Sequence, residues 1–183
     1  TDSGSGIASR GVSGITIKNN HLSGIDRHGV ELTMLTTGVY YAGIPSYADN
    51  VKLENNTIIN FGKIYQWGRG VFLVNVKNNE IKNNTIDGKN NSGAVLGIDE
   101  WRSSGLDIPG DRPDYNIISG NTTVGVLISG SNNYVMGNYV GTDPTGTIDL
   151  GNTTNGVQLY NGGKYNVVGT NGDGISDEAE RNI

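Results

Sequence analysis

The sequence predicts an all-β protein: a single-stranded right-handed parallel β-helix, a solenoid of short stacked strands with inserted loops. Two patterns predict this fold along the 183 residues: short strands that alternate apolar with polar side chains, and Gly and Asn recurring at the bends. No segment has the 3.6-residue apolar period of a helix, so we expect almost no helix. The hydrophobic content of 34% is low for a globular core but sufficient for the narrow core of a solenoid.

The first recurring strand follows a glycine. It occurs as RHGVELT, GRGVFLV, NSGAVLG, TVGVLIS and TNGVQLY, around Gly29, Gly70, Gly93, Gly125 and Gly156. The interval from Gly70 to Gly93 is about one coil, and the longer intervals indicate a coil plus an inserted loop. We therefore expect parallel pairing between coils and an interior stack of the following valines, Val30, Val71, Val126 and Val157.

The second recurring strand ends at asparagine. It occurs as GITIKNN, NVKLENN, VNVKNN, NYVMGN and YNVVGTN, closed by Asn20, Asn56, Asn79, Asn138 and Asn171. An Asn at a bend can bond to the backbone and to the Asn of the next coil, which offsets its desolvation. A β-sandwich or a propeller is the main alternative fold, but antiparallel hairpins need more frequent turns and less regular asparagines.

Length and composition bound the organisation of the chain. We expect one β-helix domain over residues 1 to 183, as a fragment or module of a longer repeat array, because the last residues stop where another strand would begin. The net charge of -5 argues against a nucleic-acid partner. No apolar run is long enough for a membrane span, and the chain has 0 Cys, which removes disulfides and thiolate metal sites.

Residues 116 to 183 carry the most specific pattern. The segments NIISGN, GVLISG, NYVGTDPTGTIDLGN, NGVQLYNGG and NVVGTNGDGISDEAERNI resemble repeats of large secreted or surface-anchored bacterial and archaeal β-helix proteins. Residues 1 to 115 resemble the general repeats of the pectate-lyase-like superfamily, which includes polysaccharide lyases, hydrolases, epimerases and adhesins. The sequence lacks the DPH motif of mannuronan epimerases, the paired-Asp signature of polygalacturonases and a pectate-lyase motif. The resemblance therefore implies a fold and an extracellular or cell-surface location, without a catalytic residue.

Stacking the marker glycines places candidate catalytic residues together. The preceding residues form one ridge, His28, Arg69, Ser92, Val124 and Asn155, and an outward ridge follows two residues after each glycine, Glu31, Phe72, Val95, Leu127 and Gln158. The candidate acids, bases and cations near these ridges are Asp26, His28, Glu31, Arg69, Asp99 and Glu100. The alternative interpretation of His28 is a structural residue at a bend.

Two insertions, from Thr33 to Asn50 and from Asp99 to Tyr115, should leave the same edge and flank the second coil. With that coil they supply candidate sugar-binding residues: Tyr40, Tyr41, Tyr47, Tyr65, Trp67, Trp101 and Arg102. Aromatic rings stack on pyranose faces, while Arg and carboxylates bond hydroxyl or uronate groups. The alternative is that the rings cover the edge of the solenoid and the charges are solvated.

The segment NGDGISDEAE, residues 171 to 180, matches much of a calcium-binding loop. The expected ligands are Asn171, Asp173, the Ile175 carbonyl, Asp177 and Glu180, with Gly174 at the sharp bend. Gly169 stands where such loops usually begin with Asp, so one ligand is missing. The alternative is a polar turn between two coils.

Three functions remain open from the sequence. The first is an extracellular or cell-surface protein that binds a polysaccharide or glycan, with calcium as the one candidate cofactor. The second is a polysaccharide lyase or glycoside hydrolase that uses the same groove, and the sequence leaves enzymatic activity undecided. The third is a structural stalk or filament subunit whose ends associate with further copies.

Overall fold

The computed structural model describes residues 4–10, 12–33, 48–62, 68–74, 76–89, 95–101, 104–108 and 115–183. These residues are nearly all β, with strands β1 to β18 and one short helix, α1 (Asp177–Glu180). This confirms the expected all-β class and the near absence of helix. The described part of the chain contains no helix long and apolar enough to cross a membrane.

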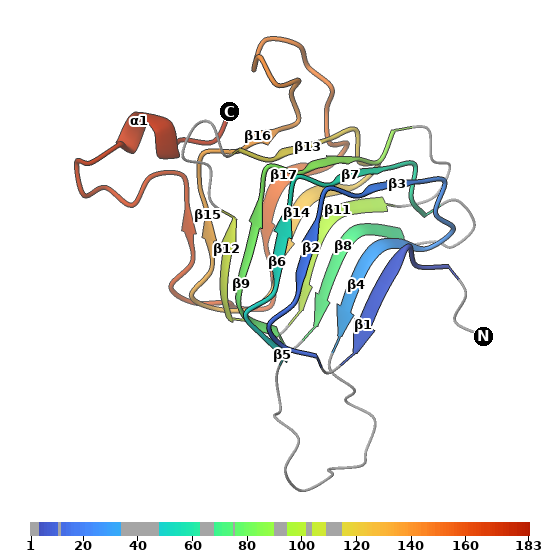
Figure 1. Ribbon diagram of the computed structural model, residues 1–183. Helices are drawn as coiled ribbons and strands as arrows, with labels where there is room; N and C mark the ends of the chain where they lie inside the picture. The colour runs from blue at the N-terminus through green and yellow to red at the C-terminus, as the bar shows by residue number, and fades with distance from the viewer. Residues whose placement is uncertain are drawn as a thin grey trace, which may run out of the picture.

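The strands form three sheets, and the chain passes through sheets A, B and C in turn (Figure 1). Sheet A is built, in order, from β1 (Ile7–Arg10), β4 (His28–Thr33), β8 (Gly68–Val74), β11 (Val95–Trp101), β14 (Val124–Ile128) and β17 (Asn155–Leu159). Sheet B is built from β2 (Thr16–Lys18), β6 (Lys52–Glu54), β9 (Val76–Lys82), β12 (Ser104–Ile108), β15 (Tyr134–Val135) and β18 (Val167–Val168), and β5 (Ala48–Asp49) also pairs with β9. Sheet C is built from β3 (His21–Ser23), β7 (Thr57–Ile59), β10 (Thr85–Asp87), β13 (Ile117–Ser119) and β16 (Tyr139–Val140).

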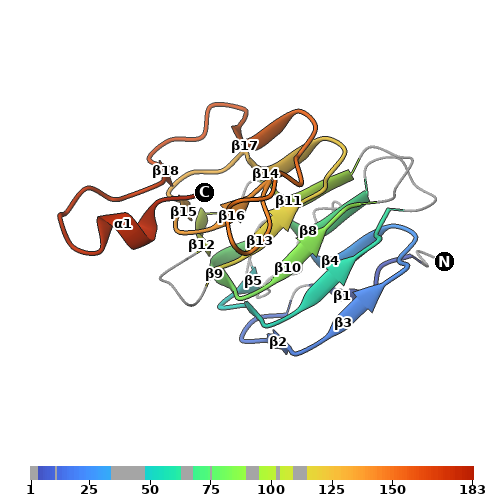
Figure 2. The same cartoon turned by 90° about the horizontal axis from the view of Figure 1, so that it is seen from above.

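The named strands of all three sheets pair in parallel, as the repeat predicts. Figure 2 shows the strands following one another from blue to orange along the molecule. We call one passage through the three sheets a circuit. Each circuit borders only the circuits before and after it, so its short strands are stabilised by those neighbours.

The core is a set of columns that run from circuit to circuit. Val30, Val71 and Val126 are fully buried, and Val157 packs against the core while partly buried, which confirms the predicted valine stack. Sheet C contributes a parallel column of buried isoleucines, Ile58, Ile86 and Ile118.

A glycine column explains why the marker residue has no side chain. A Cβ on Gly29, Gly70, Gly97 or Gly125 would lie between 2.5 and 2.7 Å from the carbonyl oxygen of the next glycine in the column. At Gly29 it would also lie 2.2 Å from Ile58 Cγ2. Glycine is therefore required by the close approach of the neighbouring strand and of the core.

The register corrects the expected third marker glycine. Ile98 pairs with Val71 and Val126, so Gly97 occupies the column position that the sequence assigned to Gly93. The two predicted ridges are consequently wrong in this circuit, where Leu96 replaces Ser92 and Asp99 replaces Val95. The cause is local: Gly93 and Gly97 are both followed by an apolar residue, Ala94 and Ile98, so the pattern alone does not distinguish them.

The expected insertions are also shorter than predicted. Residues 99 to 101 belong to β11 and residues 104 to 108 form β12, so about half of the supposed loop from Asp99 to Tyr115 is strand. Residues 48 and 49 of the first expected insertion form β5. Residues 34–47 lie outside the described residues.

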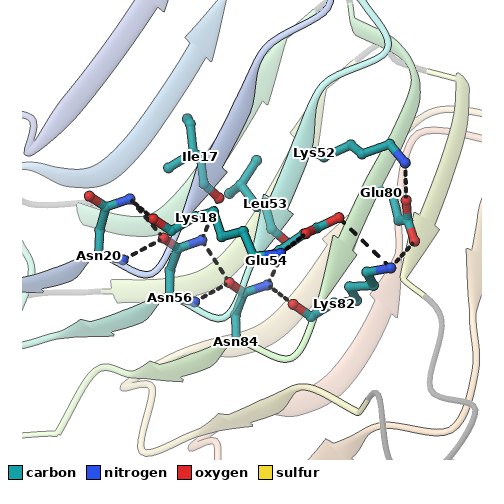
Figure 3. Close-up of polar contacts among 10 residues, drawn as sticks. All are labelled: Ile17, Lys18, Asn20, Lys52, Leu53, Glu54, Asn56, Glu80, Lys82 and Asn84. Carbon is teal, nitrogen blue, oxygen red and sulfur yellow. Dashed lines mark hydrogen bonds and ion pairs between the residues drawn. The ribbon is translucent and has the colours of Figure 1, made fainter.

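A ladder of asparagines closes the turn from sheet B to sheet C. Each ladder residue after the first receives, on its side-chain oxygen, hydrogen bonds from the backbone N–H and side-chain amide of the preceding one. The ladder consists of Asn20, Asn56, Asn84, Asn116, Asn138 and Asn182, of which Figure 3 shows the first three. Asn79 and Asn171, which the sequence placed in this stack, lie elsewhere: Asn79 accepts from Val51, and Asn171 bonds with Glu180.

The backbone conformation of the residue before a ladder position explains why the sequence often has two consecutive asparagines there. Asn19, Asn55 and Asn83 have φ of 59°, 54° and 55°, a left-handed conformation that Asn tolerates better than most residues. Gly137, before Asn138, has φ 67°. The first residue of each pair thus makes the bend, and the second makes the ladder.

Candidate functional site

The most concentrated polar cluster lies on the face of sheet A that points away from the core, over β4, β8 and β11. Register places His28 beside Arg69, and places Phe72 between Glu31 and Asp99. His28, Glu31 and Asp99 are nevertheless 1%, 6% and 2% exposed, so these polar side chains are removed from water. Buried polar groups at this density require partners.

Arg69 is the centre of the cluster. Its Nε donates to Asp99 Oδ2 at 2.5 Å, forming an ion pair in which the Arg69 side chain is 23% exposed. Its guanidinium carbon also lies 4.2 Å from the centroid of the Phe72 ring. The cation is thus oriented from two sides, by a carboxylate and by an aromatic face.

His28 is held neutral. Its Nδ1 accepts a hydrogen bond of 3.2 Å from the Arg69 backbone N–H, and its ring centroid lies 5.2 Å from that of Phe72. Burial, followed by the charges of Arg69 and Arg27, lowers the pKa of His28 from 6.5 to about 3. Because Nδ1 accepts, the proton of the neutral ring sits on Nε2, and this buried atom has no hydrogen-bond partner among the described residues.

Asp99 is in the opposite electrostatic situation. Burial raises its pKa above the ordinary value of 3.8, although the nearby Arg69 charge and hydrogen bond lower it. Arg69 Nε engages only Oδ2, and the second oxygen, Oδ1, is buried without a hydrogen-bond partner in the part of the chain that the structure describes. His28 Nε2 and Asp99 Oδ1 are therefore an unused donor and an unused acceptor in one cluster.

The remaining predicted catalytic residues differ in their surroundings. Glu31 accepts a hydrogen bond of 2.8 Å from the Ser5 hydroxyl. Asp26 lies before β4 and is partly buried, and it makes no hydrogen bond or ion pair with other described residues. Glu100 lies in β11, and its side chain lies outside the described residues.

The structure brings together His28, Arg69, Asp99 and Glu31 on three neighbouring strands. Phe72 and Ser5 complete the cluster and were missed as site residues. Phe72 lay on the predicted outward ridge, which was the available signal, whereas nothing in the sequence marked Ser5.

Most of the predicted sugar-binding residues cannot be placed. Trp101 is a residue of β11 whose side chain lies outside the described residues. The others lie outside the described residues altogether: Tyr40, Tyr41, Tyr47, Tyr65, Trp67 and Arg102.

A second polar surface covers the outward face of sheet B (Figure 3). Lys18 pairs with Glu54 at 3.0 Å, Lys52 pairs with Glu80 at 3.1 Å, and Lys82 approaches both glutamates. The hydrogen bond from Lys18 is the main cause that lowers the pKa of Glu54. With Lys18 and Lys52 exposed, Lys82 partly buried and each glutamate paired, this surface is an ordinary solvated sheet face, and such pairs contribute little stability.

The predicted calcium ligands bond within their own loop. Glu180 accepts from the Asn171 backbone N–H at 3.0 Å and from its side chain at 3.3 Å, so these two are brought together. Asp173 Oδ1 accepts from the Ile175 backbone N–H, and Asp177 accepts from the Thr170 hydroxyl. Over the residues that the structure describes, no three His, Cys, Asp or Glu side chains are grouped as a metal site. Calcium binding stays a prediction.

Comparisons of the chain with protein-family models, curated proteins and solved structures find no match.

Proposed function

We propose that the chain is a right-handed parallel β-helix of the pectate-lyase-like type that binds a polysaccharide outside the cell or on its surface. Three parallel sheets visited in a constant order support the solenoid. A parallel crossover in one sheet is almost always right-handed, which supports the handedness. The location rests on the resemblance of residues 116 to 183 to repeats of secreted and surface proteins.

One observation carries the carbohydrate proposal: the unpartnered His28 Nε2 and Asp99 Oδ1 beside the Arg69–Phe72 pair. An unmade hydrogen bond at a buried polar atom costs about 1–3 kcal/mol, so such atoms usually mark a water or ligand contact. Sugars present many hydroxyls together with apolar ring faces that pack on aromatic side chains. The mixture of polar atoms and one aromatic face in this cluster suits that chemistry.

The test is isothermal titration calorimetry with soluble oligosaccharides of several backbones. Phe72→Leu removes the aromatic face while keeping an apolar side chain. We expect it to weaken binding by roughly 2- to 12-fold, the value of an aromatic contact. Tyr134→Leu is the matched control, because Tyr134 is an exposed aromatic residue of sheet B, away from the cluster. Equal losses in both variants, or no binding by the parent chain, would contradict the proposal.

A second candidate function is glycoside hydrolysis, favoured by the placement of Glu31 and Asp99. The two carboxylates share one row of sheet A with β8 between them, so their backbones are about 9.6 Å apart. Inverting glycosidases hold their two carboxyl groups about 6.5–9.5 Å apart, a separation that side chains leaning toward each other from backbones so spaced would give, and their acid needs a raised pKa. The pKa of Asp99 is raised, which fits the acid, and Glu31 would then be the base.

This second candidate is tested by product formation. Reducing ends should appear when the parent chain is incubated with its bound polysaccharide, and Glu31→Gln should abolish them while binding is retained. Unsaturated products would instead indicate a lyase. Binding without either product leaves the chain a carbohydrate-binding protein.

A further inference from the structure

The two ends of the β-helix carry complementary halves of the contact that joins neighbouring circuits. β1 and β17 are the outer strands of sheet A, and each pairs with only one other described strand. An unpaired strand edge is a template for pairing with another chain. Which chain fits is decided by the columns, because they reach both ends of the described sheets.

The last circuit leaves core positions uncovered. Leu159 continues the column of Ile128, and Val168 continues the column of Val135. Ile128 and Val135 are buried, whereas Leu159 and Val168 are 52% and 45% exposed. In Figure 1 and Figure 2, α1 lies to one side of β17 and not over it. These two apolar side chains thus occupy inward positions without a further circuit to bury them.

The glycine column is open at the same end. From Gly6 to Gly125, a Cβ added to each column glycine would lie 2.5 to 2.8 Å from the carbonyl oxygen of the next glycine. A Cβ on Gly156 would meet no glycine, and its nearest neighbour would be Val140 Cγ1 at 3.3 Å. The described column therefore has a free place beyond Gly156, while its other end begins with Gly6.

The asparagine ladder gives the two ends opposite hydrogen-bonding character. Asn182, its last member, accepts from Asn138, and the described ladder has no further asparagine to accept from the Asn182 backbone N–H. Asn20, its first member, donates to Asn56, and no ladder residue precedes it to donate to its Oδ1. Donors at one end thus match an acceptor at the other, whereas two identical ends would not match.

We propose that the C-terminal end of the β-helix binds the N-terminal end of a second copy of this chain, so that the columns continue across the junction. The second copy's Gly6, Ile7, Ile17 and Asn20 then follow Gly156, Val157, Val168 and Asn182. A contact between two different surfaces does not close on itself, so repeated binding produces a linear filament. This self-association is independent of carbohydrate binding.

Gly156→Ala tests the junction while sparing the single molecule. Its Cβ has room in one copy, but at the junction it would face the second copy's backbone as closely as the inner glycines face theirs. In sedimentation velocity, the parent should form species larger than a dimer as its concentration rises. Gly156→Ala should weaken this association roughly tenfold or more, the order that overpacking produces. Gln158→Ala is the matched control, because Gln158 points outward from the same strand.

Leu159→Lys is a second variant that keeps the test decisive if Gly156→Ala does not fold. A charge is tolerated at this exposed position in a single copy, but the junction would bury it without a partner. Ile148→Lys is its matched control, since Ile148 is also exposed and lies in the turn between β16 and β17, outside the columns. Circular dichroism verifies that each variant is folded, and only the two junction variants should lose association.

Electron microscopy of the assembled parent chain measures the geometry of the junction. Sheet A has six strands, so each copy should advance the filament by about 29 Å at about 4.8 Å per strand. A parent chain that stays monomeric up to about 1 mM overturns the inference. Association that stops at a dimer also overturns it, because two identical ends would then be paired. Equal association of the folded junction variants and their controls would place the contact elsewhere and likewise overturn it.

Discussion

At the scale of single residues, burial of polar groups is the dominant feature. His28 and Asp99 both lose water, but burial lowers the pKa of the histidine and raises the pKa of the aspartate, because it disfavours the charged form of each. The histidine stays neutral, whereas the aspartate is paired with Arg69. The two residues should therefore respond to acid in different ways.

His28→Gln should make the protein less sensitive to acid. The pKa of His28 is about 3 when folded and near 6.5 when unfolded. Between these values the unfolded chain binds a proton that the folded chain excludes, so the free energy of unfolding falls as pH falls. This one group contributes a slope of up to about 1.4 kcal/mol per pH unit, which is absent above pH 6.5.

Urea unfolding of the parent and of His28→Gln from pH 7 to 4 measures that difference. Asp99 acts in the opposite direction, because its pKa is higher in the folded chain than in the unfolded chain and its proton uptake at falling pH therefore raises the free energy of unfolding. This contribution is present in both the parent and His28→Gln. His21→Gln is the control, since His21 is exposed in β3. Parallel pH profiles for the parent and His28→Gln would show that His28 is not held neutral.

Gly97→Ala tests the glycine column at one position. Its Cβ would lie 2.5 Å from the Gly125 carbonyl oxygen and 2.7 Å from Ile118 Cγ2, so backbone or core must shift. We expect a loss of about 1–3 kcal/mol in the free energy of unfolding, typical of overpacking. Gly156→Ala is the matched control from the same column, because its Cβ would meet only Val140 Cγ1 at 3.3 Å and Val140 O at 3.9 Å. Equal stability of the two variants in denaturant unfolding would be incompatible with the column.

At the scale of elements, the strands are too short to be stable alone, and the turns between them carry much of the specificity. Asn84 shows why. Its side chain donates to Leu53 O, Lys82 O and Asn116 Oδ1, and accepts from Asn56. One side chain thus joins three consecutive circuits.

Asn84→Ala should cost about 3 kcal/mol of unfolding free energy, because it leaves the buried Asn56 N–H without an acceptor. Asn155→Ala is the matched control, since Asn155 is exposed and makes one long bond of 3.4 Å to Gln158. Thermal or urea unfolding compares the two. A similar small effect in both variants would mean that the ladder contributes little beyond ordinary surface hydrogen bonds.

The sequence predicted the elements better than their register. Alternation identified the valine stack and parallel pairing, because each coil repeats the same inward positions. It could not choose between Gly93 and Gly97, because both precede an apolar strand and only the neighbouring strands decide which glycine enters the column. Asp99 therefore appeared to be a loop residue, and its ion pair with Arg69 could not be predicted as a strand-to-strand contact.

At the scale of the whole molecule, the loop from Asn171 to Glu180 joins the last circuit in sheet B to the ladder residue Asn182. Glu180 is nearly buried and holds Asn171 through both carboxylate oxygens. Glu180 and Asn171 are also two of the predicted calcium ligands. Calcium would have to replace these hydrogen bonds with metal coordination.

If calcium binds, the thermal midpoint of the parent chain should rise as the ion increases through about 0.1 to 1 mM, and a chelator should reverse the rise. Asp173→Ala should abolish the response. Asp149→Ala is the control, because Asp149 is an exposed acid that holds a different turn through Gly151. A midpoint insensitive to millimolar calcium, or a shift that survives in Asp173→Ala, would leave the loop as a hydrogen-bonded turn.

The repeated columns have a consequence for how such a chain can change its length. Each circuit offers its neighbours the same glycine, apolar and asparagine positions, as the pairing of Val71, Ile98 and Val126 shows. Removing one whole circuit, from Ile98 to Gly125, would bring Gly97 directly before Val126 and rejoin two strands that already share a register. Duplication or loss of a gene segment of this size would therefore lengthen or shorten the molecule by one circuit. The interface between the circuits on either side would stay the same. Insertions at the turns would be tolerated for the same reason, which leaves the ends of the strands free to acquire binding residues.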